Sequence, residues 1–71
     1  MTRLKILFGK RLKQLRRNKG LTQAQLAEAA RVSVDLISNI ERGVNAPSFD
    51  TVEKICEVLG IEAQYLFRFD E

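Results

Sequence analysis

The chain has 71 residues, of which 45% are hydrophobic and 30% charged, so it has room for one small folded domain and too much apolar surface for a disordered tail. A single cysteine and the lack of histidine exclude an internal disulfide, a conventional zinc site and histidine-dependent catalysis. The sequence also contains no glycine-rich phosphate loop, so we expect a chain that is not an enzyme and needs neither a metal nor a cofactor.

The basic side chains gather at one end of the chain. Residues 1–20 contain eight of the twelve Lys and Arg and no acidic residue, whereas residues 21–71 contain four basic and nine acidic side chains. This asymmetry is typical of a protein with an anionic partner, such as nucleic acid or lipid, although a solvated helix face explains it equally well. No apolar run approaches the roughly 20 residues that span a bilayer. The lack of an export signal predicts a cytoplasmic protein.

The first 20 residues have the periodicity of an amphipathic helix, which Gly20 ends in a left-handed conformation. Gly9 lies inside this helix, where it lowers the helix propensity, so we expect another helix to pass close to it. At about 100° per residue, the apolar face consists of Leu4, Phe8, Leu12 and Leu15.

Two short helices joined by a tight turn follow over about residues 22–42. Thr22 and Gln25 form a capping box at the start of the first helix, and Ser33 caps the second. The second helix turns its two isoleucines inward, which is the pattern of a helix-turn-helix. Its opposite face is left free to enter a groove of DNA and carries Val34, Asp35, Ser38 and Asn39.

A fourth helix is predicted over about residues 48–59, before Gly60. Its apolar positions recur at helical spacing and are Phe49, Val52, Ile55, Cys56 and Leu59. We interpret Cys56 as a small core residue, with a redox switch as the alternative. Residues 61–70 add a last turn or short helix, so the sequence predicts an all-α domain of five helices.

The run LTQAQLAEAARVSVDLISNIERGVNAPSFDTVEKICEVLG, with GKRLKQLR before it, resembles the Cro/phage-repressor (XRE) family of bacterial transcriptional regulators. The resemblance covers nearly the whole chain. It implies one compact, lambda-repressor-like domain over residues 1–71 whose second and third helices form the helix-turn-helix. It also implies a sequence-specific regulator that binds double-stranded DNA, with no membrane and no small-molecule ligand as partner.

Carried over position by position, the resemblance assigns two sets of DNA contacts and one ion pair. The bases would be read from the third helix by Ser33, Val34, Asp35, Ser38 and Asn39. Phosphates would be bound by Thr22, Gln23, Arg11, Arg42, Asn45 and Ser48. Capping alone or simple solvation remains the alternative for several of these side chains. Arg16 and Glu41 match positions that form a structural salt bridge in the family.

Two features depart from the family pattern. Arg31 stands in the turn where glycine is usual, so a left-handed backbone there would be strained. The third helix has no Arg or Lys between Val32 and Ile40, so guanine cannot be read by a bidentate arginine from that segment, and we expect a site that favours A·T pairs.

One such module makes few base contacts, so the resemblance implies a homodimer on a pseudo-palindromic operator with half-sites about 10 to 10.5 base pairs apart. The candidate dimer interface within residues 61–70, with one residue of the first helix, is Tyr65, Leu66, Phe67, Phe69 and Ile6. Closure of the core is the alternative for Leu66 and Phe67. Two other functions are weighed against DNA binding. They are a protein-interaction module, such as an antitoxin-type subunit, and a membrane-surface peptide, which would remove the first helix from the core.

Overall fold

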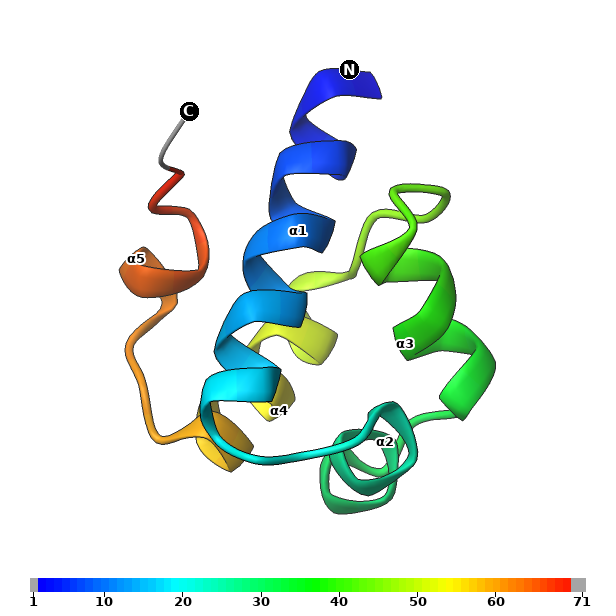
Figure 1. Cartoon of the computed structure of the whole chain (residues 1–71), viewed down its shortest axis with the longest axis vertical. Helices are drawn as coiled ribbons and strands as arrows, with labels where there is room; N and C mark the ends of the chain where they lie inside the picture. The colour runs from blue at the N-terminus through cyan, green and yellow to red at the C-terminus, as the bar shows by residue number, and fades with distance from the viewer. Residues whose placement is uncertain (1, 70–71) are drawn as a thin grey trace.

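The computed structural model describes residues 2–69 and places five α-helices, with no strand, in that range. They are α1 (Thr2–Asn18), α2 (Gln23–Ala30), α3 (Val34–Glu41), α4 (Phe49–Leu59) and α5 (Ala63–Leu66). Figure 1 shows α1 running along the molecule, with α3 on one side of it and α5 on the other. The predicted all-α, five-helix fold is therefore confirmed. Residue 70, which ends the predicted dimerisation segment, lies outside the described residues.

Three of the helices, α2, α3 and α4, begin at the predicted capping residues. Thr22 Oγ1 accepts a hydrogen bond from Gln25 N at 3.0 Å, and Gln25 Oε1 accepts one from Thr22 N at 2.9 Å, which completes the capping box. Ser33 and Ser48 cap α3 and α4 through their hydroxyl oxygens. Gly60, with φ 68°, ends α4 in the left-handed conformation. The local signals in the sequence thus set where the helices start and stop.

All five helices contribute to one core. α1 packs against α3 and α5, while α2 packs against α3 and α4. No helix among residues 2–69 combines the length and hydropathy needed to cross a membrane. The buried cluster consists of Phe8, Leu12, Leu26, Ala27, Ile37, Ile40, Val52, Ile55, Leu59 and Leu66.

Gly9 sits at a close approach of α1 to the end of α3. A Cβ atom at this position would lie 2.3 Å from the Ile40 carbonyl oxygen and 2.8 Å from that of Glu41. No side chain fits there, so the glycine lets the end of α3 rest directly on α1. This confirms the close helix contact predicted from the sequence, and it fixes the position of α3 through backbone atoms.

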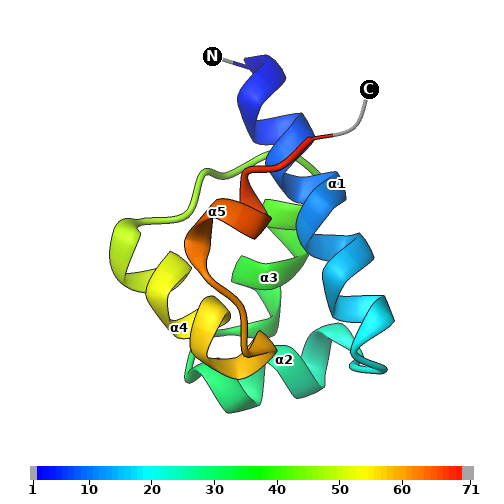
Figure 2. The ribbon, with the colours of Figure 1, turned by 90° about the vertical axis from the view of Figure 1, so that its left-hand side faces the viewer.

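Two apolar residues assigned to inner helix faces are exposed instead. Phe49 is 87% exposed and Leu4 is 46% exposed. Both stand in the first turn of a helix, where side chains tilt toward the helix N-terminus and therefore project beyond the body of the fold. Figure 2 shows that the start of α1 and the segment after α5 lie at the same end of the molecule.

Candidate nucleic-acid interface

The turn between α2 and α3 has the geometry that the sequence predicts. Arg31 has φ 60° and ψ 43°, which is left-handed, and its backbone N–H donates to the end of α2. Val32 N donates to Ala27 O at 3.0 Å, so the chain reverses tightly over a buried alanine. The arginine therefore occupies the strained position that glycine takes at least cost.

α3 presents one face to the core and one to solvent (Figure 1). Its two isoleucines are fully buried. On the outer face Val34 is 44% exposed, Asp35 is exposed, and Ser38 and Asn39 are half-buried. The structure thus brings the predicted base-reading residues together on one accessible strip of helix.

Two of these side chains already make hydrogen bonds inside the molecule. Ser33 Oγ accepts from Leu36 N at 3.0 Å, which leaves the hydroxyl proton available as a donor. Asn39 Oδ1 accepts from Arg42 Nη1 at 3.2 Å. The second bond was not predicted from the sequence, although the three-residue spacing on one helix face is a signal for it.

A buried polar cluster joins α1, α2 and α3. Arg16 Nε and Nη2 donate to the two carboxylate oxygens of Glu41 at 2.7 and 3.0 Å, as the family resemblance implies. Arg16 Nη1 also donates to Leu21 O at 2.7 Å. Hydrogen bonding to Glu41 raises the pKa of the Arg16 guanidinium above its ordinary value, against the smaller opposing effect of burial. This cluster holds the helix-turn-helix against α1.

Most of the predicted phosphate-binding residues lie at helix ends or in the loop after α3. Thr22 and Gln23 stand at the N-terminus of α2, whose unpaired backbone N–H groups favour an anion. The Gln23 amide also donates to Glu41 Oε1 at 3.0 Å, a contact that sequence analysis missed. Three further candidates, at the end of α3, in the loop and at the α4 cap, are exposed: Arg42, Asn45 and Ser48.

Arg11 lies apart from the other predicted phosphate-binding residues. Its Nε donates to the Tyr65 carbonyl oxygen at 2.8 Å and its Nη1 to Gln14 Oε1 at 3.0 Å. The guanidinium therefore binds the end of α5, on the side of α1 opposite α3 (Figure 1). In the single chain the Arg11 side chain therefore stabilises the end of α5, apart from the other candidates, and its phosphate contact stays a prediction.

The predicted dimer interface is only partly assembled. Tyr65 and Phe67 are 41% and 43% exposed, and Phe69 is half-buried against the core. Leu66 is fully buried, so it is a core residue and not an interface residue. This confirms for Leu66 the alternative that it closes the core. Ile6 is exposed but borders the Gly43 backbone, at the end of α3, so it lies across α1 from α5.

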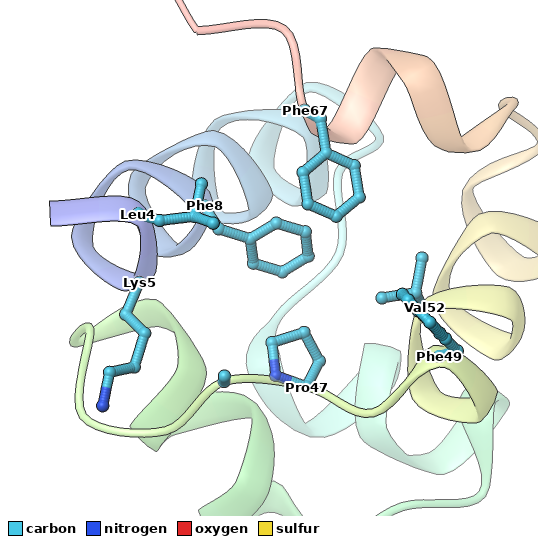
Figure 3. A pocket seen from close by; sticks show the side chains of 8 residues that line it. Leu4, Lys5, Phe8, Pro47, Phe49, Val52 and Phe67 are labelled. Atoms are coloured by element: carbon cyan, nitrogen blue, oxygen red, sulfur yellow. The ribbon is translucent and has the colours of Figure 1, made fainter. Parts of the chain in front are cut away.

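An apolar groove of about 400 Å³ lies beside the exposed C-terminal aromatics (Figure 3). The Phe8 and Phe67 rings form one side, with centroids 5.1 Å apart, and the start of α4 forms the other. Sequence analysis missed Phe49 here because helical spacing placed it in the core. The groove is lined by Leu4, Lys5, Phe8, Ala46, Pro47, Phe49, Val52 and Phe67.

Comparison with known proteins matches residues 12–66 to a family described as helix-turn-helix. The immunity repressor protein of Bacillus phage phi105 is 43% identical over 54 residues, or 76% of this chain and 38% of the repressor. The control protein C.BamHI of Bacillus amyloliquefaciens is 36% identical over 93% of this chain and 83% of that protein.

A solved structure indicates the same family as the sequence relatives. The restriction-modification controller protein C.AhdI from Aeromonas hydrophila superposes with a TM-score of 0.86 and 35% identity, covering 89% of this chain and 96% of that one. The family match over residues 12–66 contains both helices of the turn, α4, α5 and the second part of α1. The chain therefore belongs to the Cro/phage-repressor type of helix-turn-helix transcriptional regulators.

Proposed function

We propose that this chain binds double-stranded DNA in a sequence-specific manner as a homodimer, with α3 in the major groove of a pseudo-palindromic operator. The observation that carries the proposal is the outer face of α3, a strip of accessible side chains on a helix whose end is bonded to the N-terminus of α2 through Gln23 and Glu41. A helix with a free face of this kind fits the width of the major groove. Such a regulator acts where the DNA is, in the cytoplasm.

The surrounding residues supply the contacts that orient α3 on the duplex. The N-terminus of α2 offers backbone N–H groups to one phosphate, and Arg42, Asn45 and Ser48 offer donors on the far side of α3. The eight basic side chains of residues 1–20 add long-range attraction that weakens as salt rises. Positioning and base reading are thus divided between different elements.

The exposed apolar surface supports the homodimer. Phe49 and Phe67 line a groove that includes the start of α1, and Tyr65 is exposed two residues before Phe67. Exposed apolar surface of this kind is typical of a protein-protein contact. We assign this surface to contact with a second copy of the chain. Two copies would then read half-sites about one helical turn, roughly 10 base pairs, apart.

The test is selection of random DNA duplexes at moderate salt, followed by sequencing. We expect a palindromic consensus with the wild-type chain and loss of that consensus with the double variant Ser38→Ala, Asn39→Ala. A matched control, Asn18→Ala with Gln64→Ala, removes two exposed polar side chains away from α3 and should leave the consensus unchanged. Binding without any enriched sequence would contradict the proposal.

A further inference from the structure

Recognition by asparagine depends on which atoms of its amide are available. To read adenine, Oδ1 accepts from the N6 amino group while Nδ2 donates to N7. Guanine presents two acceptors, N7 and O6, on the same edge, so donors alone can read it. The base that Asn39 suits is therefore decided by the direction in which its oxygen faces and by the charge beside that oxygen.

Arg42 engages that oxygen. Its Nη1 donates to Asn39 Oδ1 at 3.2 Å from three residues further along the chain. A guanidinium carries only donors, so the contact also fixes the orientation of the amide. The oxygen faces Arg42, and Nδ2 with its two hydrogens faces away from it.

The backbone beneath the pair is held independently of the side-chain bond. Asn39 O accepts from Val44 N at 2.9 Å and from Asn45 N at 3.3 Å, and Arg42 N donates to Ser38 O at 3.0 Å. Arg42 is exposed, whereas Asn39 is half-buried. Removal of the Arg42 side chain therefore releases Oδ1 and leaves the frame of α3 in place.

We propose that Arg42 makes Asn39 a reader of guanine, an inference that rests on the proposed DNA-binding function and adds the base that this position takes. The Nδ2 hydrogens donate to N7 or O6 of guanine. The guanidinium beside Oδ1 attracts O6 and repels the amino group of adenine. Arg42 is thus a specificity-determining residue that acts through its neighbour.

Two neighbours agree with this choice. Asp35 stands four residues before Asn39 on the same face and offers only acceptors, which suit the N4 amino group of cytosine. The Ser33 oxygen accepts from Leu36 N, which leaves its hydroxyl proton available to donate outward. A guanine at this position differs from the A·T preference expected from the lack of Arg and Lys within α3, because Arg42 lies just beyond the end of that helix.

The experiment extends the duplex selection to Arg42→Ala and Asn39→Ala. Asn39→Ala identifies the half-site position that Asn39 reads, because the preference there is lost. We expect guanine at that position with the wild-type chain. Arg42→Ala should shift the preference toward adenine by about fivefold or more, the lower range for one bidentate contact. Dissociation constants for the guanine and adenine versions of one duplex give the same ratio even where the variant binds weakly.

The matched control is Lys54→Ala, which removes an exposed basic side chain on α4, outside residues 1–20, and keeps the bond between Arg42 and Asn39. It should leave the consensus unchanged. Adenine at the Asn39-dependent position of the wild type, or a preference that Arg42→Ala does not alter, would overturn the inference and leave DNA binding standing. No enriched sequence at all with the wild type would overturn the proposed function itself.

Discussion

Arg31 stores backbone strain at the centre of the helix-turn-helix. It is the non-glycine residue with positive φ among residues 2–69, and its side chain is exposed. A β-carbon in this conformation costs about 1 kcal/mol. Arg31→Gly should therefore raise the free energy of unfolding by about 1 kcal/mol and the melting temperature by about 4–8 °C. Thermal unfolding measures this, with Arg31→Ala as the control that keeps the strain. Equal melting temperatures for the two variants would contradict it.

A substitution at Gly9 should change the free energy of unfolding in the opposite direction from Arg31→Gly. Alanine usually stabilises a helix interior by about 1 kcal/mol relative to glycine. Here the added Cβ would collide with the Ile40 and Glu41 carbonyl oxygens, so Gly9→Ala should destabilise the protein by about 2 kcal/mol. Urea unfolding of this variant, beside Asn18→Ala on the exposed end of α1, distinguishes the two effects. A stabilised Gly9→Ala would mean that α1 and α3 are further apart.

The Cys56 thiol gives a prediction about pH. Burial, with a smaller contribution from the Glu53 carboxylate, raises the pKa of Cys56 above its ordinary value. The thiolate is the reactive form, so alkylation by iodoacetamide at pH 8 should be slower in the folded protein than in urea. Because the folded-state pKa is the higher one, stability should also fall as pH rises above about 8.5, the unfolded value. Cys56→Ala should lack that decline.

Hydrogen bonds between distant residues mark the limit of sequence analysis at this scale. Capping residues, the left-handed turn and the close contact at Gly9 all follow from local chemistry, so they could be predicted. The bonds from Arg11 to α5 and from Gln23 to Glu41 depend on how long, flexible side chains fill space after the helices have packed. No spacing rule fixes that choice for residues 54 or 18 positions apart.

At the scale of elements, the ion pair between α1 and α3 can be tested by a double-mutant cycle. Arg16 and Glu41 are only 7% and 8% exposed, so removing one partner leaves a buried, unpaired charge. Arg16→Met or Glu41→Leu alone should cost about 3–5 kcal/mol of stability, and the double variant should recover much of that loss. Urea unfolding of the four proteins measures the coupling. Additive losses would show that the pair does not act as a unit.

The helices themselves could be predicted because α1 to α4 have clear apolar periodicity and because α2, α3 and α4 also carry their own capping residues. The failures fall at the first turns, where Leu4 and Phe49 keep the apolar spacing of their helices but extend past the core. Periodicity reports which side of a helix a residue is on. It does not report whether a neighbouring helix extends far enough to cover that residue.

For the whole molecule, the apolar groove predicts self-association. Phe49 is 87% exposed in the single chain, so Phe49→Ser should leave the stability of the monomer nearly unchanged. If it is a central contact of the dimer, the dissociation constant should rise about 30-fold, as for an interface residue that contributes about 2 kcal/mol. Sedimentation equilibrium over a range of concentrations measures this.

Val44→Ser is the matched control, because Val44 is an exposed apolar residue in the loop after α3 and does not line the groove. It should leave the dissociation constant of the dimer unchanged. A wild-type chain that stays monomeric, with and without DNA, would contradict the homodimer. The exposed groove would then favour the protein-interaction function, with a different protein as partner.

The contact at Gly9 has a consequence for engineering. α3 contacts α1 through backbone atoms, and two isoleucines and one glutamate on its inner face are buried against the rest of the domain. None of these three residues belongs to the outer strip of α3. The scaffold and the reading surface are therefore separable. A new set of side chains at positions 34, 35, 38, 39 and 42 could be transplanted onto this framework as a cassette, retargeting the domain to another operator while its folding is left intact.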